Sequence, residues 1–233
     1  MNKGKLYLIP VPIHNEEEFN SKFIPPYLTE EINKLNVFAV ENIRTSRRFL
    51  RKINPKFNIN NTTFHLIDKR TEEEEYSNII NCLINGNDVG VMSESGCPGI
   101  ADPGQKLCSL AHHKNILIKP LIGPSSILLA LMSSGLNGQK FTFHGYLPIE
   151  KEKRIKAIKK LHPKTGSHIF IETPYRNQKV YDDLIQNLKP DIRKLCIATD
   201  LTGINESIFT KKISELKQSN IILKKYPTIF IFE

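Results

Sequence analysis

The segment with the clearest capacity for ligand chemistry is the stretch from Ser93 to Gly104. It holds three glycines, at positions 96, 99 and 104, together with two prolines. Glycine lacks a Cβ atom, so a ligand can approach the backbone closely there, and proline stiffens the chain and lowers the entropy lost on binding. An ordinary long strand-to-helix connection is the alternative, but it needs fewer glycines and prolines. We therefore expect a ligand-binding loop.

A second segment of this kind is the turn Ile122–Ser126, which contains a Gly-Pro pair followed by two serines. Ser125 or Ser126 is suited to cap a helix, and the same N–H groups and hydroxyls are suited to hold a ligand carboxylate. Both segments directly follow apolar runs that read as strands, at 88–92 and 116–121. Ligands of open α/β sheets bind beyond the carboxyl ends of the strands. We expect the two segments to line one pocket.

Arginines and lysines gather at two further places. Arg44, Arg47 and Arg48 follow the apolar run 37–40, and the segment 150–161 contains six basic residues. Arginine forks suit phosphate oxygens, and a lysine-rich helix suits sequence-independent contact with a nucleic-acid backbone. The alternative in both cases is a solvated helix face. The net charge of +9, with an isoelectric point near 9.3, fits either a polyanionic partner or a lysine-rich surface without one.

The elements that must position these residues alternate along the chain, as in βαβ units. We predict an α/β fold with two domains, 1–120 with a mostly parallel sheet and 121–233 with a mixed sheet, and a ligand cleft between them. Strands are predicted at 6–9, 37–40, 63–67, 88–92, 116–121, 141–147, 167–172, 195–198 and 228–232. Helices are predicted at 45–52, from 71 onward, and at 125–134, 150–161 and 175–188.

Several functional classes are disfavoured by what the sequence lacks. No G-x-G-x-x-G follows the first strand and no P-loop motif occurs, which argues against a dinucleotide-binding domain and a P-loop NTPase. The four cysteines show no metal-site spacing, so we expect reduced thiols and no metal. No apolar run approaches the length of a membrane span, and residues 1–10 do not resemble a signal peptide. A cytoplasmic protein is expected.

Taken together, the motifs resemble those of the tetrapyrrole methylase superfamily of S-adenosylmethionine-dependent methyltransferases. Within it the chain is similar to the branch that methylates a cytidine ribose 2′-hydroxyl of small-subunit ribosomal RNA. The matching segments occur in family order over nearly the whole chain: 7–15, 40–48, 93–104, 120–126, 134–136, 143–148, 171–176 and 200–206. The resemblance implies two α/β domains, S-adenosylmethionine as cofactor, RNA as partner and a homodimer.

Arg44, Arg47 and Arg176 are the candidates for binding the RNA, because the arginine guanidinium group suits phosphate oxygens and can stack on bases. The resemblance implies which residues contact the cofactor. The candidates for cofactor contacts are Pro12, Ile13, Ser95, Gly96, Cys97, Ile100, Ser125, Ser126, Ile171, Glu172, Pro227 and Thr228.

A ribose hydroxyl is a weak nucleophile until its proton is leaving, so a nearby base is needed. Glu41 and Glu94 each end a predicted strand on the expected side, and they are the candidate catalytic residues. Either one is equally suited to accept structural hydrogen bonds. Asp102 is assigned a turn-stabilising role within its loop.

The sequence departs from the family pattern at several positions. His14 stands where the family has glycine, Asn42 and Glu94 stand where aspartate is usual, and the chain ends at Glu233, before a small additional segment common in the ribosomal branch. Two alternatives therefore stay open. One is a methyltransferase with a small-molecule or other non-RNA acceptor, and the other is a non-catalytic RNA-binding relative, which the change at His14 keeps in consideration.

Overall fold

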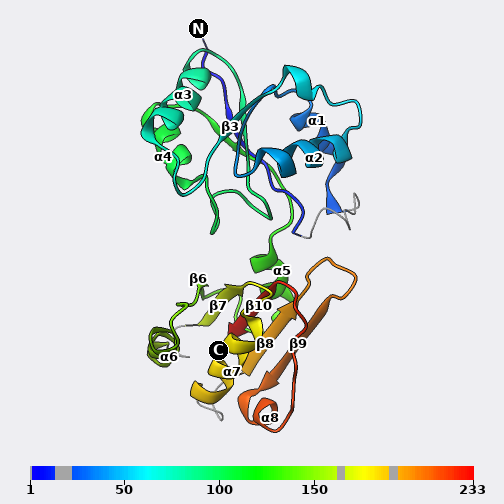
Figure 1. Ribbon diagram of the computed structural model, residues 1–233, viewed down its shortest axis with the longest axis vertical. Helices are drawn as coiled ribbons and strands as arrows, with labels where there is room; N and C mark the ends of the chain where they lie inside the picture. Colours follow the sequence, from blue (N-terminus) through cyan, green and yellow to red (C-terminus); the bar gives the residue numbers. More distant parts are fainter. Residues whose placement is uncertain (1, 14–22, 162–165, 189–193) are drawn as a thin grey trace. The chain divides into compact units, whose positions relative to one another are not determined.

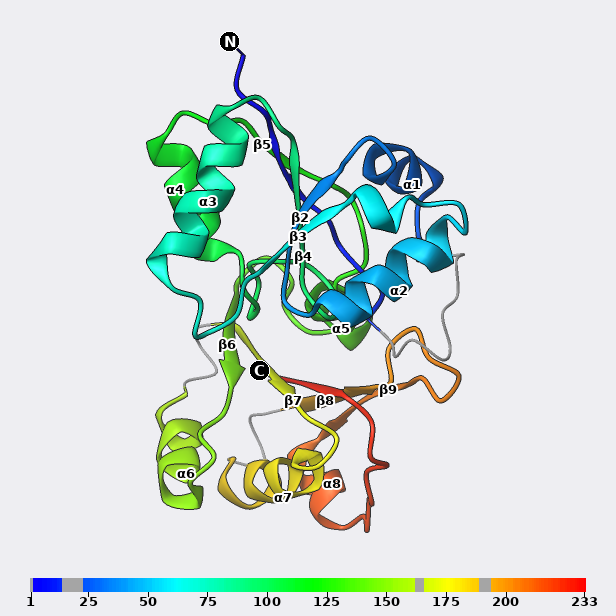
Figure 2. The same cartoon turned by 45° about the horizontal axis from the view of Figure 1, so that its top comes forward.

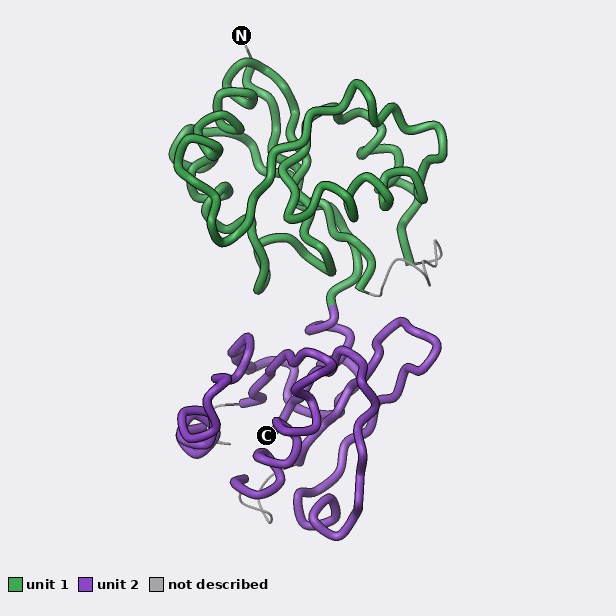
Figure 3. Tube along the Cα trace, viewed as in Figure 1, with its two compact units in different colours: residues 1–125 green, residues 126–233 purple. Residues whose placement is uncertain are grey.

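The computed structural model describes residues 2–13, 23–161, 166–188 and 194–233 and divides into two compact units (Figure 1, Figure 3). Unit 1 comprises residues 1–125 and unit 2 comprises residues 126–233. The division lies a few residues after the boundary predicted at position 120. Each unit contains one five-stranded sheet with helices on both faces, and each is described by itself.

The sheet of unit 1 is entirely parallel, in the order β3-β2-β4-β1-β5. Its strands are β1 (Leu6–Leu8), β2 (Val37–Val40), β3 (Thr63–Leu66), β4 (Val89–Met92) and β5 (Ile118–Pro120). Its helices are α1 (Pro26–Ile32), α2 (Ile43–Ile53), the short 3₁₀ helix η3 (Ile59–Asn61), α3 (Glu73–Ile84) and α4 (Gln105–His113). The parallel order places the carboxyl ends of all five strands at one edge.

Two apolar layers hold this sheet, because successive strand residues point to opposite faces. Tyr7 and Phe38 pack with α1 and α2 on one face, whereas Leu6 and Val89 pack with α3 and α4 on the other. Figure 2 shows the two helix pairs on opposite sides of the sheet. Burial on both faces explains why β2 and β4 are uninterrupted apolar runs rather than alternating ones.

The sheet of unit 2 is mixed, in the order β6-β7-β10-β8-β9. The β6–β7 pair is parallel and the other pairs are antiparallel. Its strands are β6 (Phe141–Tyr146), β7 (Ser167–Glu172), β8 (Lys194–Thr199), β9 (Ser207–Lys212) and β10 (Thr228–Phe232). Its helices are α5 (Ser126–Ser134), α6 (Lys151–Lys160), α7 (Asn177–Asn187) and α8 (Ile213–Lys217).

Phe170 and Phe230 pack with α6, α7 and α8 on one face of this second sheet, and Ile169 and Ile231 pack with α5 on the other. The predicted fold class, with a parallel first sheet and a mixed second one, is confirmed. No helix in the described ranges is both long and apolar enough to cross a bilayer. The cysteines are free thiols, of which only Cys196 is fully buried.

Candidate active site

Four loops of unit 1 meet at the carboxyl edge of its sheet. They follow β1, β2, β4 and β5, and hydrogen bonds to backbone carbonyls join the loops after β1, β4 and β5. The N–H of Val11 donates to the carbonyl of Gly96 (2.9 Å), and the hydroxyl of Ser95 donates to the carbonyl of Ile13 (3.1 Å). The thiol of Cys97 donates to the carbonyl of Pro124 (3.4 Å). The structure therefore brings the predicted residues after β1, β4 and β5 into one cluster.

Two glycines in this cluster have different physical roles. Gly96 has a φ of +68°, and a Cβ atom built there would meet no atom within 4 Å. A Cβ at Gly123 would instead lie 2.4 Å from the Cβ of Pro10. Gly123 is thus required for the loops after β1 and β5 to pack together, whereas Gly96 leaves open space above its backbone. The open space lies where the sequence predicts ligand contact.

Three carboxylates lie at the same edge. The backbone N–H of Glu94 donates to Oε2 of Glu41 (3.1 Å), and the hydroxyl of Thr45 approaches Oε1 of Glu94 (3.5 Å). The two predicted catalytic candidates are therefore brought together. The geometry also assigns Glu41 a structural role, because its carboxylate orients the start of the glycine-rich loop. No set of His, Cys, Asp or Glu in the described ranges is arranged to hold a metal ion.

Asp102 is the third carboxylate, and its surroundings differ from those expected of a turn residue. Its pKa is raised to about 6, first by burial and then by the negative charges of Glu41 and Glu94, with a small opposing effect of Lys69. Within the described residues its carboxylate accepts no hydrogen bond, so the predicted turn-stabilising role is wrong. A half-buried carboxyl group that titrates near neutrality is suited to general acid–base chemistry. No local sequence signal marks it, because its pKa depends on its burial and on Glu41, which follows a different strand, as well as on Glu94 of its own loop.

Two of the predicted RNA-binding arginines lie beside this cluster. Arg44 and Arg47 are exposed on α2, and neither forms an ion pair with another described residue. The Oδ1 atom of Asn42 caps α2 by accepting from the N–H groups of Arg44 (3.0 Å) and Thr45 (3.3 Å). The replacement of aspartate by Asn42 therefore leaves the helix start intact. Both arginines remain available to a phosphate.

Arg176 belongs to unit 2, so the structure does not place it with the other two arginines. Its Nη2 atom donates to the carbonyls of Leu147 (2.9 Å) and Pro148 (3.3 Å). The same atom lies 3.1 Å from Oε2 of Glu172, an ion pair without hydrogen-bond geometry. Oε1 of Glu172 accepts from the N–H of Thr173 (2.8 Å). The buried Glu172 carboxylate is therefore engaged within unit 2.

The remaining predicted cofactor contacts of unit 2 gather at one end of β7 and β10. Thr228 pairs with Glu172 in the antiparallel register, and Ile171 is half-buried beside them. The carbonyl of Pro227 accepts from the N–H of Asp200 (3.0 Å). Ser125 ends unit 1 and Ser126 begins α5, and both are half-buried. In unit 1, Pro12 is half-buried and Ile100 is exposed, whereas His14 lies outside the described residues.

Comparisons with known proteins give consistent results. Residues 5–217 match the family model described as Tetrapyrrole (Corrin/Porphyrin) Methylases. Ribosomal RNA small subunit methyltransferase I of Buchnera aphidicola subsp. Schizaphis graminum is 30% identical over 238 residues, covering 100% of this chain and 80% of its own length.

Solved structures resemble this chain in fold. The methyltransferase CobJ superimposes with a TM-score of 0.62 at 16% identity, covering 98% of this chain and 93% of its own. Uroporphyrin-III C-methyltransferase from Thermus thermophilus, solved with S-adenosylhomocysteine, superimposes with a TM-score of 0.56 at 12% identity. The match covers 98% of this chain and 97% of that one. At these identities the structural matches establish the two-unit fold.

Proposed function

Because the chain belongs to the tetrapyrrole methylase family and is therefore an S-adenosylmethionine-dependent methyltransferase, we propose that its acceptor is a ribose 2′-hydroxyl of small-subunit ribosomal RNA. The observation that carries the proposal is the 30% identity, over the full chain, to a methyltransferase named for that RNA. Arg44 and Arg47, which form no ion pair with a described residue, lie beside the three carboxylates and support it, since the arginine guanidinium group recognises phosphate oxygens.

The residues of unit 1 fit the cofactor. The backbone at Gly96 faces open space, and its positive φ is one that side-chain-bearing residues rarely adopt. The loop after β1 lies against this glycine through Val11, and the Ser95 hydroxyl lies on the same loop. We assign Pro12, Ile13, Ser95, Gly96 and the adjoining loop residues to cofactor binding. The cofactor supplies a methyl group on a sulfonium centre, ready for displacement.

Asp102 is the proposed general base. Its carboxylate would take the proton of the ribose 2′-hydroxyl, and the cofactor, held by the loops after β1 and β4, would supply the methyl group to the ribose oxygen. A pKa of about 6 keeps Asp102 mostly ionised at neutral pH yet basic enough to hold the proton. Glu41 and Glu94 then act as the negative neighbours that raise this pKa. The sequence-based assignment of Glu41 or Glu94 as the base stays a competing prediction.

A substitution at Gly96 tests the cofactor loop. Gly96→Ala is expected to weaken S-adenosylmethionine binding at least about tenfold, because the added methyl group occupies the space through which a ligand reaches the backbone. Gly135→Ala is the matched control, since Gly135 follows α5 with a φ of +67° and also has no atom within 4 Å of a built Cβ. Both variants carry similar backbone strain, so calorimetry should show weaker binding of S-adenosylmethionine only for Gly96→Ala. Equal affinity in the two variants would contradict the assignment.

Methyl transfer itself tests the acceptor. Labelled S-adenosylmethionine is incubated with the full chain and small ribosomal subunits that lack the modification. The label is expected in RNA, on a 2′-O-methylcytidine after nuclease digestion. Label on a small molecule but not on RNA would favour the alternative acceptor class. Absence of cofactor binding would favour a non-catalytic RNA-binding relative.

We further propose a homodimer, acting in the cytoplasm where its RNA substrate is made. Leu128 and Met132, one turn apart on α5, are 57% and 80% exposed, and together they form an apolar surface on this helix. A second copy covering this surface would bury them. Light scattering is expected to give twice the chain mass of 26.7 kDa, and a concentration-independent monomer would overturn the proposal.

A further inference from the structure

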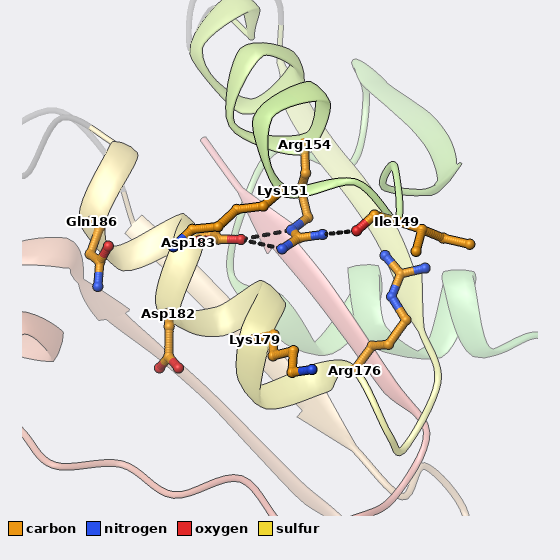
Figure 4. A pocket seen from close by; sticks show the side chains of 8 residues that line it. All are labelled: Ile149, Lys151, Arg154, Arg176, Lys179, Asp182, Asp183 and Gln186. Atoms are coloured by element: carbon orange, nitrogen blue, oxygen red, sulfur yellow. Dashed lines mark hydrogen bonds and ion pairs between the residues drawn. The ribbon is translucent and has the colours of Figure 1, made fainter.

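A candidate site for a charged ligand lies within unit 2, whereas the cluster described above belongs to unit 1. An open pocket of about 550 Å³ lies beside the contact between α6 and α7, and charged side chains from both helices line it (Figure 4). Among the charged side chains that line it, Arg154 and Asp183 are buried, whereas Lys151, Lys179 and Asp182 are exposed. A buried charge needs a partner of opposite charge, and an exposed unpaired one is available to a ligand. The pairing of each group therefore indicates what the pocket accepts.

The inner wall is an ion pair that is already satisfied. Nε and Nη2 of Arg154 contact Oδ2 of Asp183 at 2.7 and 2.6 Å, and both side chains are buried. Nη1 of Arg154 donates to the carbonyls of Pro148 (3.0 Å) and Ile149 (2.7 Å). The charge of Asp183 is thereby neutralised, and α6 is fixed against α7. This wall positions the rim without itself needing a ligand.

The rim carries unused positive charge. Lys151 on α6 and Lys179 on α7 are exposed, and neither forms an ion pair with any residue that the structure describes. All contacts of Arg176 with described residues run through Nη2, which leaves its Nε and Nη1 donors for a ligand. Asp182, on α7 like Lys179, accepts a hydrogen bond from Gln178 (2.9 Å). Two lysines without a described partner and the free donors of Arg176, whose charge is already paired with Glu172, therefore line the same pocket as the carboxylate of Asp182.

The outward face of α6 extends this charge beyond the pocket. Its exposed basic residues are Lys151, Lys153, Lys156, Lys159 and Lys160. Of these, Lys153 is paired with Glu150 (2.7 Å). The cationic groups at the rim would be enough to bind a single small anion. The additional exposed lysines of α6 favour a polymer that carries many negative charges. Phosphodiester backbones carry such charges and remain ionised at every physiological pH.

We propose that the α6–α7 pocket binds a backbone phosphate of the RNA acceptor through Lys151, Lys179 and Arg176, and that the lysine face of α6 takes the adjoining phosphates. The proposal rests on the proposed function for the identity of the polyanion. Such contacts position an RNA without reading its sequence. The pocket therefore contributes affinity and orientation, while the cluster in unit 1 carries the chemistry.

The test is a double substitution at the rim, Lys151→Gln with Lys179→Gln, in the full chain. Binding of small-subunit ribosomal RNA is measured over a range of salt concentrations. We expect affinity to fall roughly tenfold, and the slope of log K against log salt to become shallower by about 1.5 to 2, because two phosphate contacts are lost. The KM for RNA should rise while kcat stays near the wild-type value. Both lysines are exposed, so the fold should be retained.

The matched control is Lys211→Gln with Lys212→Gln, which removes the same charge from β9, at the opposite edge of the sheet from β6. Its salt slope should equal that of the wild type. An unchanged slope in the rim variant, or equal changes in both variants, would overturn the proposal. A loss seen with intact subunits but not with protein-free RNA would show that the pocket takes a protein instead, and would also overturn it. If the wild type binds the RNA but transfers no methyl group to it, the proposed function is contradicted. The salt slopes of the rim variant and the control variant would still show whether the pocket binds RNA phosphates.

Discussion

Asp102→Asn is expected to lower kcat by about 10² to 10⁴, because the side chain keeps its shape but can no longer take the proton of the acceptor hydroxyl. Binding of S-adenosylmethionine should change little, since the substitution adds no bulk to the loop. In the wild type, kcat should rise with pH until a carboxyl group with a pKa of about 6 is ionised. That acidic limb should be missing in the variant.

Glu94→Gln is the control that separates Asp102 from the sequence-based candidates. The charge of Glu94 helps to raise the pKa of Asp102, so its removal should shift the acidic limb to lower pH and leave the maximal kcat nearly intact. A loss of kcat in Glu94→Gln, together with normal turnover in Asp102→Asn, would identify Glu94 as the base and refute this mechanism.

The ionisation of Asp102 should also make the free energy of unfolding depend on pH. Its pKa is raised in the folded chain, so the folded state holds a proton that the unfolded state has already released between about pH 4 and pH 6. The stabilisation is present below the unfolded pKa and is lost as pH rises through the folded pKa. Asp102→Asn should therefore be more stable than the wild type by about 1 to 2 kcal/mol at pH 7.5, after allowing for partial exposure. Near pH 3.5 the wild type and Asp102→Asn should have equal free energies of unfolding, as measured by denaturant titration.

Arg154→Met is the substitution with the largest expected cost to the fold. It leaves the buried carboxylate of Asp183 without its partner and frees the carbonyls of Pro148 and Ile149. Breaking a buried ion pair from one side typically costs about 3 to 5 kcal/mol. Urea titration should show this loss of unfolding free energy, accompanied by weaker packing of α6 on α7.

The double variant Arg154→Met with Asp183→Leu tests the physical cause. Replacing both partners by apolar side chains removes the stranded charge, so most of the lost stability should return. Lys153→Ala provides the contrast, because Lys153 and Glu150 form an exposed pair on the same helix, and its loss should cost less than about 1 kcal/mol. A cost for Arg154→Met no larger than that of Lys153→Ala would show that the buried pair does not hold the two helices together.

The helices and strands that were predicted from the sequence are those in which the local residue pattern favours the same secondary structure that tertiary packing stabilises. The strand at 167–172 and the helix at 126–134 lie where apolar runs and a terminal glycine placed them. The spacing of apolar residues did not predict helix α1 (Pro26–Ile32), because this helix begins with a proline and is too short to show a helical period. It also did not reveal β9, an edge strand ending in two lysines, which is a strand because it pairs with β8.

Arg154 illustrates a similar limit within a correctly predicted helix. Its sequence neighbours are lysines, and the segment reads as one continuous basic face. In the structure Arg154 alone among these basic residues is buried, because it lies on the side of α6 that faces Asp183. A helix that appeared uniformly basic therefore has one buried structural cation, Arg154, and several exposed lysines, of which Lys153 is paired with Glu150. The pocket beside it depends on that division.

The sequence by itself determined that this chain is a two-part α/β protein with a glycine-rich loop after its fourth strand. Those features depend on residue types and short-range spacing, which can be read directly. Only the tertiary structure decided that Asp102 titrates near neutrality and that Asp183 is neutralised by Arg154. Electrostatic energies depend on burial and on distances of a few ångströms between segments far apart in the chain, and no local pattern encodes them.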